Sequence, residues 1–75
     1  MKAYVGVQQR DEKSALYYGP FESVFVAKIA AEQFKKRTPK YEFCVNVWEE
    51  ADLFATYEQY GPATVVDPSK LGEPQ

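Results

Sequence analysis

The sequence predicts an α+β domain: a three-stranded antiparallel sheet in the order β-β-α-β, one main helix packed on it, and a short C-terminal helix or extended tail. Two segments, 2–9 and 40–48, alternate apolar and polar residues with the period of a strand. Residues 24–37 instead repeat their apolar positions with the period of a helix. Residues 1–62 are predicted to form one compact domain. Residues 63–75, with two prolines and a glycine, are predicted to form an extended, partly disordered tail.

The first two strands are expected to form a hairpin. The polar run 10–14 fits its loop, and residues 15–18 fit the returning strand. Gly19-Pro20 is expected to end that strand, because proline has no N–H to donate to a ladder. Within residues 2–9, one face carries Ala3, Val5 and Val7.

Ser23 is expected to cap the main helix, which Thr38-Pro39 ends. At about 100° per residue, its apolar face comprises Val26, Ala27, Ala30, Ala31 and Phe34. Phe25 falls toward the charged side of the helix. This ring either packs on Phe21 or a loop, or is exposed beside basic residues.

The third strand is expected over residues 40–48, with Trp48 on the face away from the main helix. Residues 49–60 have helical spacing, with Leu53, Phe54, Tyr57 and Tyr60 on one side. This second helix is short, and it is expected to bury Trp48 if it covers that face. The predicted core comprises Val5, Val7, Leu16, Tyr18, Val26, Ala30, Phe34, Phe43, Val45 and Val47.

The composition favours binding over catalysis. Six tyrosines, five phenylalanines and one tryptophan supply contact area, whereas the chain contains no histidine and one cysteine, Cys44. No nucleophile has a histidine partner, and the acids Glu49, Glu50 and Asp52 lack the glycine turn of a calcium loop. We therefore predict a non-enzymatic protein with no catalytic residues, no cofactor and no metal site.

The cysteine count also bears on location. A lone cysteine cannot form an intramolecular disulfide, and no stretch approaches the ~20 apolar residues of a membrane span. The prediction is a cytoplasmic protein that does not bind membranes.

The predicted function is protein binding, most plausibly as a phage- or mobile-element-type inhibitor or regulator of a larger host enzyme or nucleoprotein complex. The net charge is −2, and the acids gather in the C-terminal third of the chain. Aromatic anchors beside acids suit a partner with a basic groove. The predicted contact residues are Trp48, Glu49, Glu50, Asp52, Tyr57 and Tyr60. The protein is expected to be a monomer or a homodimer, because an exposed edge strand can pair two copies.

The alternative function is single-stranded nucleic-acid binding, through sheet aromatics and a basic helix end. Its contact residues would be Tyr4, Tyr17, Lys35, Lys36 and Arg37. The negative net charge argues against it, because phosphates would be repelled by the acids beside the sheet.

One short passage resembles a known family. The run Tyr18-Gly19-Pro20-Phe21-Glu22-Ser23, followed by an alanine-rich helix, resembles the strand–GPF–x–S–helix passage of SPOR domains, which bind peptidoglycan glycans. SPOR domains repeat their βαβ unit, whereas no second glycine-rich strand–helix turn follows Trp48. The resemblance therefore implies a local way of turning from strand to helix, and glycan binding is not part of the predicted function.

Overall fold

A computed structural model describes residues 1–8, 15–41, 44–61 and 63–71 of the chain. Its strands and helices follow the order β1 (Ala3–Gln8), β2 (Ala15–Phe21), α1 (Val24–Arg37), β3 (Val45–Glu49), α2 (Glu50–Tyr60) and β4 (Thr64–Val66). Two short 3₁₀ helices, η1 (Pro39–Tyr41) and η2 (Pro68–Lys70), follow α1 and β4. The predicted hairpin loop at 10–14 lies outside the described residues.

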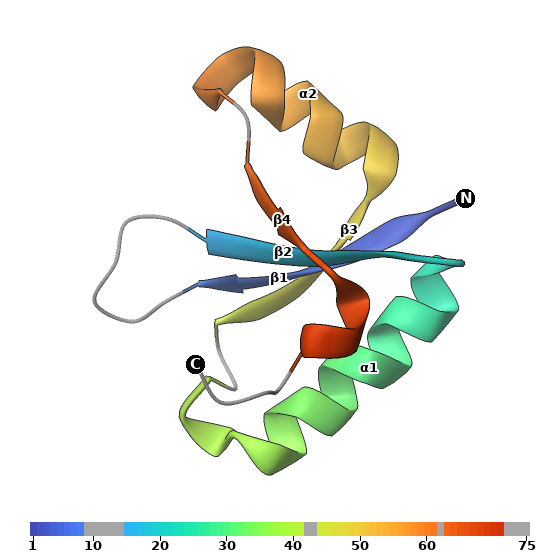
Figure 1. Ribbon diagram of the computed structural model, residues 1–75, viewed down its shortest axis with the longest axis vertical. Helices are drawn as coiled ribbons and strands as arrows, with labels where there is room; N and C mark the ends of the chain where they lie inside the picture. The colour runs from blue at the N-terminus through green and yellow to red at the C-terminus, as the bar shows by residue number, and fades with distance from the viewer. Residues whose placement is uncertain (9–14, 42–43, 62, 72–75) are drawn as a thin grey trace.

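The described residues form a sheet of four strands in the order β3-β1-β2-β4. β1 runs antiparallel to both β2 and β3, whereas β4 runs parallel to β2, with Tyr17 opposite Val65 and Tyr18 opposite Val66. The α+β class is confirmed, but the prediction of three antiparallel strands is wrong. The difference arises because α2 carries the chain from β3 at one edge of the sheet to the other edge, where the supposed tail adds a parallel strand (Figure 1).

Part of the segment expected to be a tail is packed on the domain. Val66 packs against the core and Leu71 is buried in it. Asp67 caps η2, where hydrogen bonds from the Ser69 hydroxyl (2.6 Å) and the Ser69 N–H (2.9 Å) lower the pKa of its carboxyl. The domain boundary at residues 62 and 63 stays a prediction, and residues 72–75 lie outside the described part of the chain.

Helix α1 has the predicted bounds and the predicted cap, since the Ser23 Oγ accepts a hydrogen bond from the Val26 N–H at 3.2 Å. Its buried face consists of Ala27, Ala31 and Phe34. The core position predicted for Val26 is wrong, because its side chain is 38% exposed. The two small alanines let the helix backbone approach the sheet. Because these alanines and not Val26 face the sheet, the Phe25 ring lies on the outer side of α1 and is exposed.

Two strand ends differ from expectation. β2 continues through Gly19-Pro20 to Phe21, and its pairing with β1 shifts between Ala3 and Val5. β3 begins only at Val45, because residues 39–41 form η1, where the Tyr41 ring stacks on Phe34 at 5.9 Å.

The main core lies between the sheet and α1. Five predicted core residues are buried there: Val5, Val7, Tyr18, Phe34 and Val45. Leu16, Ala30 and Val47 are half-buried against them, and the position predicted for Phe43 lies outside the described residues. Ala3, Ala27, Ala31 and Leu71 complete the cluster.

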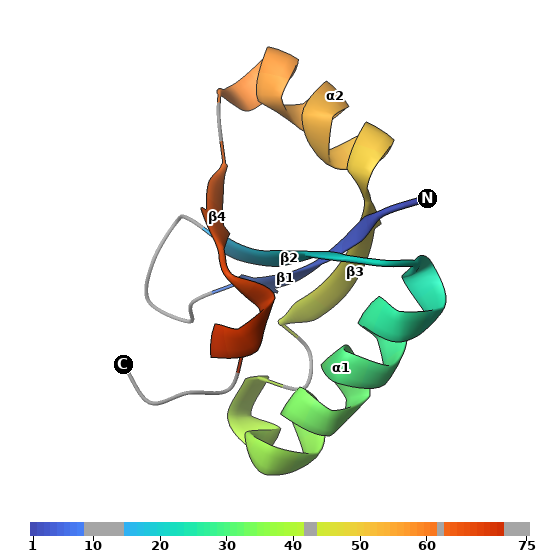
Figure 2. The ribbon, with the colours of Figure 1, turned by 45° about the vertical axis from the view of Figure 1, so that its right-hand side comes forward.

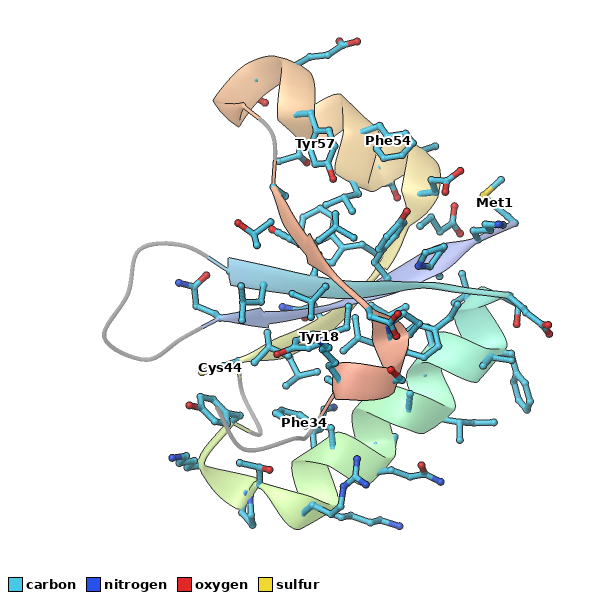
Figure 3. All side chains as sticks on the ribbon, in the orientation of Figure 1. Met1, Tyr18, Phe34, Cys44, Phe54 and Tyr57 are labelled. Atoms are coloured by element: carbon cyan, nitrogen blue, oxygen red, sulfur yellow. The ribbon has the colours of Figure 1, made fainter. Side chains whose placement is uncertain are left out.

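The two helices lie on opposite sides of the sheet (Figures 1 and 2). Figure 3 shows Phe34 and Tyr18 on the α1 side, and Phe54 and Tyr57 on α2 across the sheet. None of the helices within the described ranges has the length and apolar content needed to cross a bilayer. The position of α2 decides how much of the second sheet face stays open.

Candidate contact site on the second face of the sheet

Strand register brings aromatic side chains together on the face away from α1. Gly6 of β1 is opposite Tyr17 of β2 on one side and Asn46 of β3 on the other. Residues directly opposite one another in a sheet share a face, and so do residues two apart in one strand. We call the open part of this surface the aromatic face; it comprises Gly6, Gln8, Tyr17, Asn46 and Trp48.

Tyr17 and Trp48 meet across the glycine of the middle strand. Their ring centroids are 6.0 Å apart and the planes make an angle of 80°, an edge-to-face contact. A Cβ at Gly6 would lie 3.0 Å from both the Trp48 Nε1 and the Tyr17 Cε1. Glycine at this position therefore lets both rings lie down over β1. Both side chains stay half-exposed.

A small notch lies beside this ring pair. It has a volume of about 70 Å³, and it is lined by Gly6, Gln8, Ala15, Tyr17, Cys44, Asn46 and Trp48. Pockets for small-molecule ligands usually measure about 300–1,000 Å³. The notch is too small for such a ligand, but it offers a shallow recess with two amide side chains at its rim.

Helix α2 closes the other end of the same face. Leu53 is completely buried, and Tyr4 is nearly so. The Tyr4 hydroxyl donates a hydrogen bond to Glu50 Oε2 at 3.4 Å. Burial, reinforced by the nearby Glu50 charge, raises the pKa of the Tyr4 hydroxyl. These contacts join α2 to the sheet, and Tyr17 and Trp48 lie half-buried beside them.

The predicted contact residues are only partly brought together. Trp48 is half-exposed, while Glu49 and Asp52 are exposed at the junction of β3 and α2. Glu50 is turned to Tyr4, and Tyr57 is half-buried with its ring 5.3 Å from that of Phe54. Tyr60 is the last residue of α2, and the prediction for its side chain lies outside the described part.

The residues of the nucleic-acid alternative are divided between the two sides of the sheet. Tyr4 is buried under α2, and Tyr17 lies on the aromatic face. Lys35, Lys36 and Arg37 form the last turn of α1, which covers the opposite face. A strand of nucleic acid stacked on Tyr17 would therefore not reach these cations on the same surface.

Reactive groups are dispersed. Within the described ranges, no three residues among cysteine, aspartate and glutamate gather closely enough to hold a metal ion. Cys44 is a half-buried free thiol at the edge of the notch. The predicted lack of enzymatic activity stays a prediction.

Sequence reasoning left one feature of the α1 side open and missed another. Phe25 and Ile29, at i and i+4, are 73% and 44% exposed on the outer surface of α1. A groove of about 420 Å³ runs between α1 and the outer edge of β3, lined by Lys28, Ala31, Glu32, Lys35, Val45, Asn46 and Val47. The helix periodicity indicated the first feature, because Phe25 lay off the apolar face. The second depends on which strand forms the sheet edge, which no local pattern specifies.

No family model, curated protein or solved structure matches the chain. Function must therefore be inferred from the surface itself.

Proposed function

We propose that this chain is a non-enzymatic protein-binding module, an inhibitor or regulator of a larger enzyme or nucleoprotein complex of the kind that phages and mobile elements direct at a host. The observation that carries the proposal is the Tyr17–Trp48 pair. Two large rings lie half-exposed on a sheet face that has its own helix, α2, at one end only.

The pair has the physical properties of an interface anchor. Trp and Tyr are enriched among residues that dominate binding energy, especially where they are held rigidly before the partner arrives. Here the edge-to-face contact and the close approach to Gly6 fix both rings. Binding therefore orders few side chains. The entropy cost of ordering thus offsets less of the free energy that is gained by burying the rings.

The rim suggests the chemistry of the partner. Asp52 is exposed in the first turn of α2, which has acids but no bases in its first and last turns. A basic rim around an apolar centre complements this surface and speeds association. The same acids disfavour a polyanionic partner.

The test compares captured partners. The tagged full chain and three variants, Trp48→Ala, Tyr17→Ala and Phe25→Ala, are used to capture proteins from host lysate, and the captured protein is then purified for affinity measurement. Truncating a binding hot spot costs about 2 kcal/mol, so Trp48→Ala should weaken binding about 30-fold. Phe25→Ala is the matched control, because it removes a more exposed ring on the opposite side of the sheet.

Circular dichroism and thermal melting establish that each variant is folded. Equal loss of binding in Trp48→Ala and Phe25→Ala would contradict the aromatic face as the contact. Titration with single-stranded DNA and RNA at ~50 mM and ~200 mM salt tests the alternative. Tight binding that falls steeply with salt, and is lost on replacing Lys35, Lys36 and Arg37, would favour nucleic acid instead.

A further inference from the structure

The outer edge of β3 has hydrogen-bonding groups whose direction can be assigned. β3 is the first strand of the sheet, and among the described strands only β1 pairs with it. The Gln8 N–H donates to the Cys44 carbonyl at one end of that ladder, and the Glu50 N–H donates to the Lys2 carbonyl at the other. Backbone groups alternate in direction along an antiparallel strand. Asn46 and Trp48 therefore bond toward β1, whereas the N–H and C=O groups of Val45 and Val47 and the N–H of Glu49 point to the open edge; the Glu49 carbonyl belongs to the N-cap of α2.

We propose that two copies of this chain form a two-fold symmetric dimer by antiparallel pairing of their β3 strands, with Val47 opposite Val47 of the second copy. This register places Val45 opposite Glu49 of the second copy, and Glu49 opposite its Val45. In these pairs the outward N–H and C=O groups of Val47 bond to those of Val47 in the second copy, and the outward Glu49 N–H donates to the Val45 carbonyl of the second copy. The result is one continuous eight-stranded sheet without the open β3 edges, which are otherwise liable to uncontrolled pairing.

Charge complementarity favours a second copy over other extended segments. Val45, Val47 and Glu49 project to the α1 side of the sheet, as the core position of Val45 shows. Helix α1 runs antiparallel to β3, so its basic C-terminal end lies near Val45. Glu49 of the second copy, opposite Val45, then enters the groove beside Lys35. The Glu49 end of each β3 strand therefore meets the basic C-terminal end of α1 in the other copy. Two-fold symmetry makes this contact twice.

The charges at the seam balance. Each copy contributes Lys28 and Lys35 from the groove, and the acids Glu32 and Glu49. Lys35 and Glu32 already form an ion pair at 3.0 Å. Within the described residues of the isolated chain, Lys28 forms no ion pair, whereas the dimer brings a further carboxylate into the groove.

The space beside β3 fits a second helix. α1 lies over β3 and β1. Because neighbouring strands are about 4.8 Å apart, a two-fold axis at the seam places the two α1 helices roughly 10 Å from each other. Packed helices are separated by about 8–10 Å. The groove of about 420 Å³ on one copy, which receives Glu49 of the second copy, therefore also faces the flank of the other α1 across the seam.

The pairing also has a consequence for the aromatic face. A two-fold axis perpendicular to the sheet keeps both aromatic faces on the same side, and it brings Trp48 opposite Asn46 of the second copy. Two ring pairs then share one broad surface, which can engage two sites of a partner at once. The dimer itself does not depend on the proposed function, because its existence is tested without any partner.

The experiment measures association of the full chain by sedimentation equilibrium between ~1 and ~500 µM. Glu49→Lys and Lys35→Glu should each raise the dimer dissociation constant about 10-fold, and the double variant should return it to within about 3-fold of the original. Lys36→Glu is the matched control: it makes the same charge change one residue further along α1, outside the groove lining, and should leave the constant unchanged. A variant that merely failed to fold would not be rescued by a second reversal.

Backbone pairing is tested separately by Val47→Pro. Its N–H points to the open edge, so proline removes intermolecular hydrogen bonds without removing one to β1. Association should be lost while circular dichroism is kept. In the unaltered chain, hydrogen exchange at the amides of Val47 and Glu49 should slow as concentration rises. A monomer throughout the range, an unaffected Val47→Pro dimer, lack of rescue by the double reversal, or protection at a different surface would each overturn the proposal.

Discussion

Gly6 lies directly beneath the Trp48 indole, so close that a Cβ at this position would be 3.0 Å from Nε1. The structure shows that the close approach is made by side chains from both neighbouring strands. The candidate contact site therefore depends on the absence of a side chain as much as on the rings themselves.

Replacing Gly6 with leucine should displace both rings. The added side chain occupies the space of the Trp48 and Tyr17 rings, and overpacking of this kind costs about 1–3 kcal/mol. Because Trp48 is the only tryptophan, intrinsic fluorescence reports its environment without interference. We expect the emission to shift to longer wavelength as the indole moves into water, and the affinity for the captured partner to fall. Unchanged emission would show that the indole does not lie over β1.

Phe34 and Phe25 form a matched pair for testing the core. Both lie on α1, but Phe34 is buried and stacked on Tyr41, whereas Phe25 is 73% exposed. Phe34→Ala should lower the free energy of unfolding by about 3–5 kcal/mol, the usual cost of removing a buried ring. Phe25→Ala should change it by less than about 0.5 kcal/mol. Urea denaturation measures both, and similar losses in the two variants would show that α1 is rotated differently.

Leu71 tests whether the segment after β4 belongs to the fold. Its side chain is buried against the core, beyond the predicted end of the compact domain. Leu71→Ala should lower the free energy of unfolding by about 2 kcal/mol or more. Val65→Ala, at an exposed position of β4, is the control and should change it little. A stability unaffected by Leu71→Ala would favour a detached tail.

The raised pKa of Tyr4 predicts a loss of stability in alkali. Burial favours the neutral phenol in the folded state, while the unfolded chain ionises at its ordinary pKa of about 10. The stabilisation of the folded state by the neutral Tyr4 phenol is therefore complete below about pH 10. It is lost as the pH rises from about 10 through the higher pKa of Tyr4 in the folded state. The free energy of unfolding, measured across this range, should fall less steeply in Tyr4→Phe than in the unaltered chain.

Glu50→Gln separates the two causes of that shift. Without the carboxylate charge, the pKa of Tyr4 should move down toward its ordinary value but stay above it, because burial is the largest cause of the shift and is unchanged. The phenolate absorbance of the six tyrosines gives the titration, and the late-titrating one is identified by its absence in Tyr4→Phe. A titration curve that Glu50→Gln leaves unaltered would contradict the hydrogen bond between these side chains.

The spacing of apolar residues predicted the helices and strands that bury one face along their length. The bounds of α1 and its Ser23 cap follow from local spacing and hydrogen bonding, and the same holds for the existence of α2. The orientation of Trp48 away from α1 followed from strict alternation in β3. Local pattern also placed Phe25 off the apolar face of its helix, although it left open whether that ring was covered.

Composition and residue spacing were enough to predict an α+β chain, rich in aromatics and without histidine, whose helices and strands each have one apolar face. Three further features come from long-range packing: β4 runs parallel to β2, β3 lies at a sheet edge, and Lys35 and Tyr17 are on opposite sides of the sheet. Local spacing specifies which residues of an element share a face. It does not specify which other element that face meets, because that choice depends on packing between residues far apart in the chain.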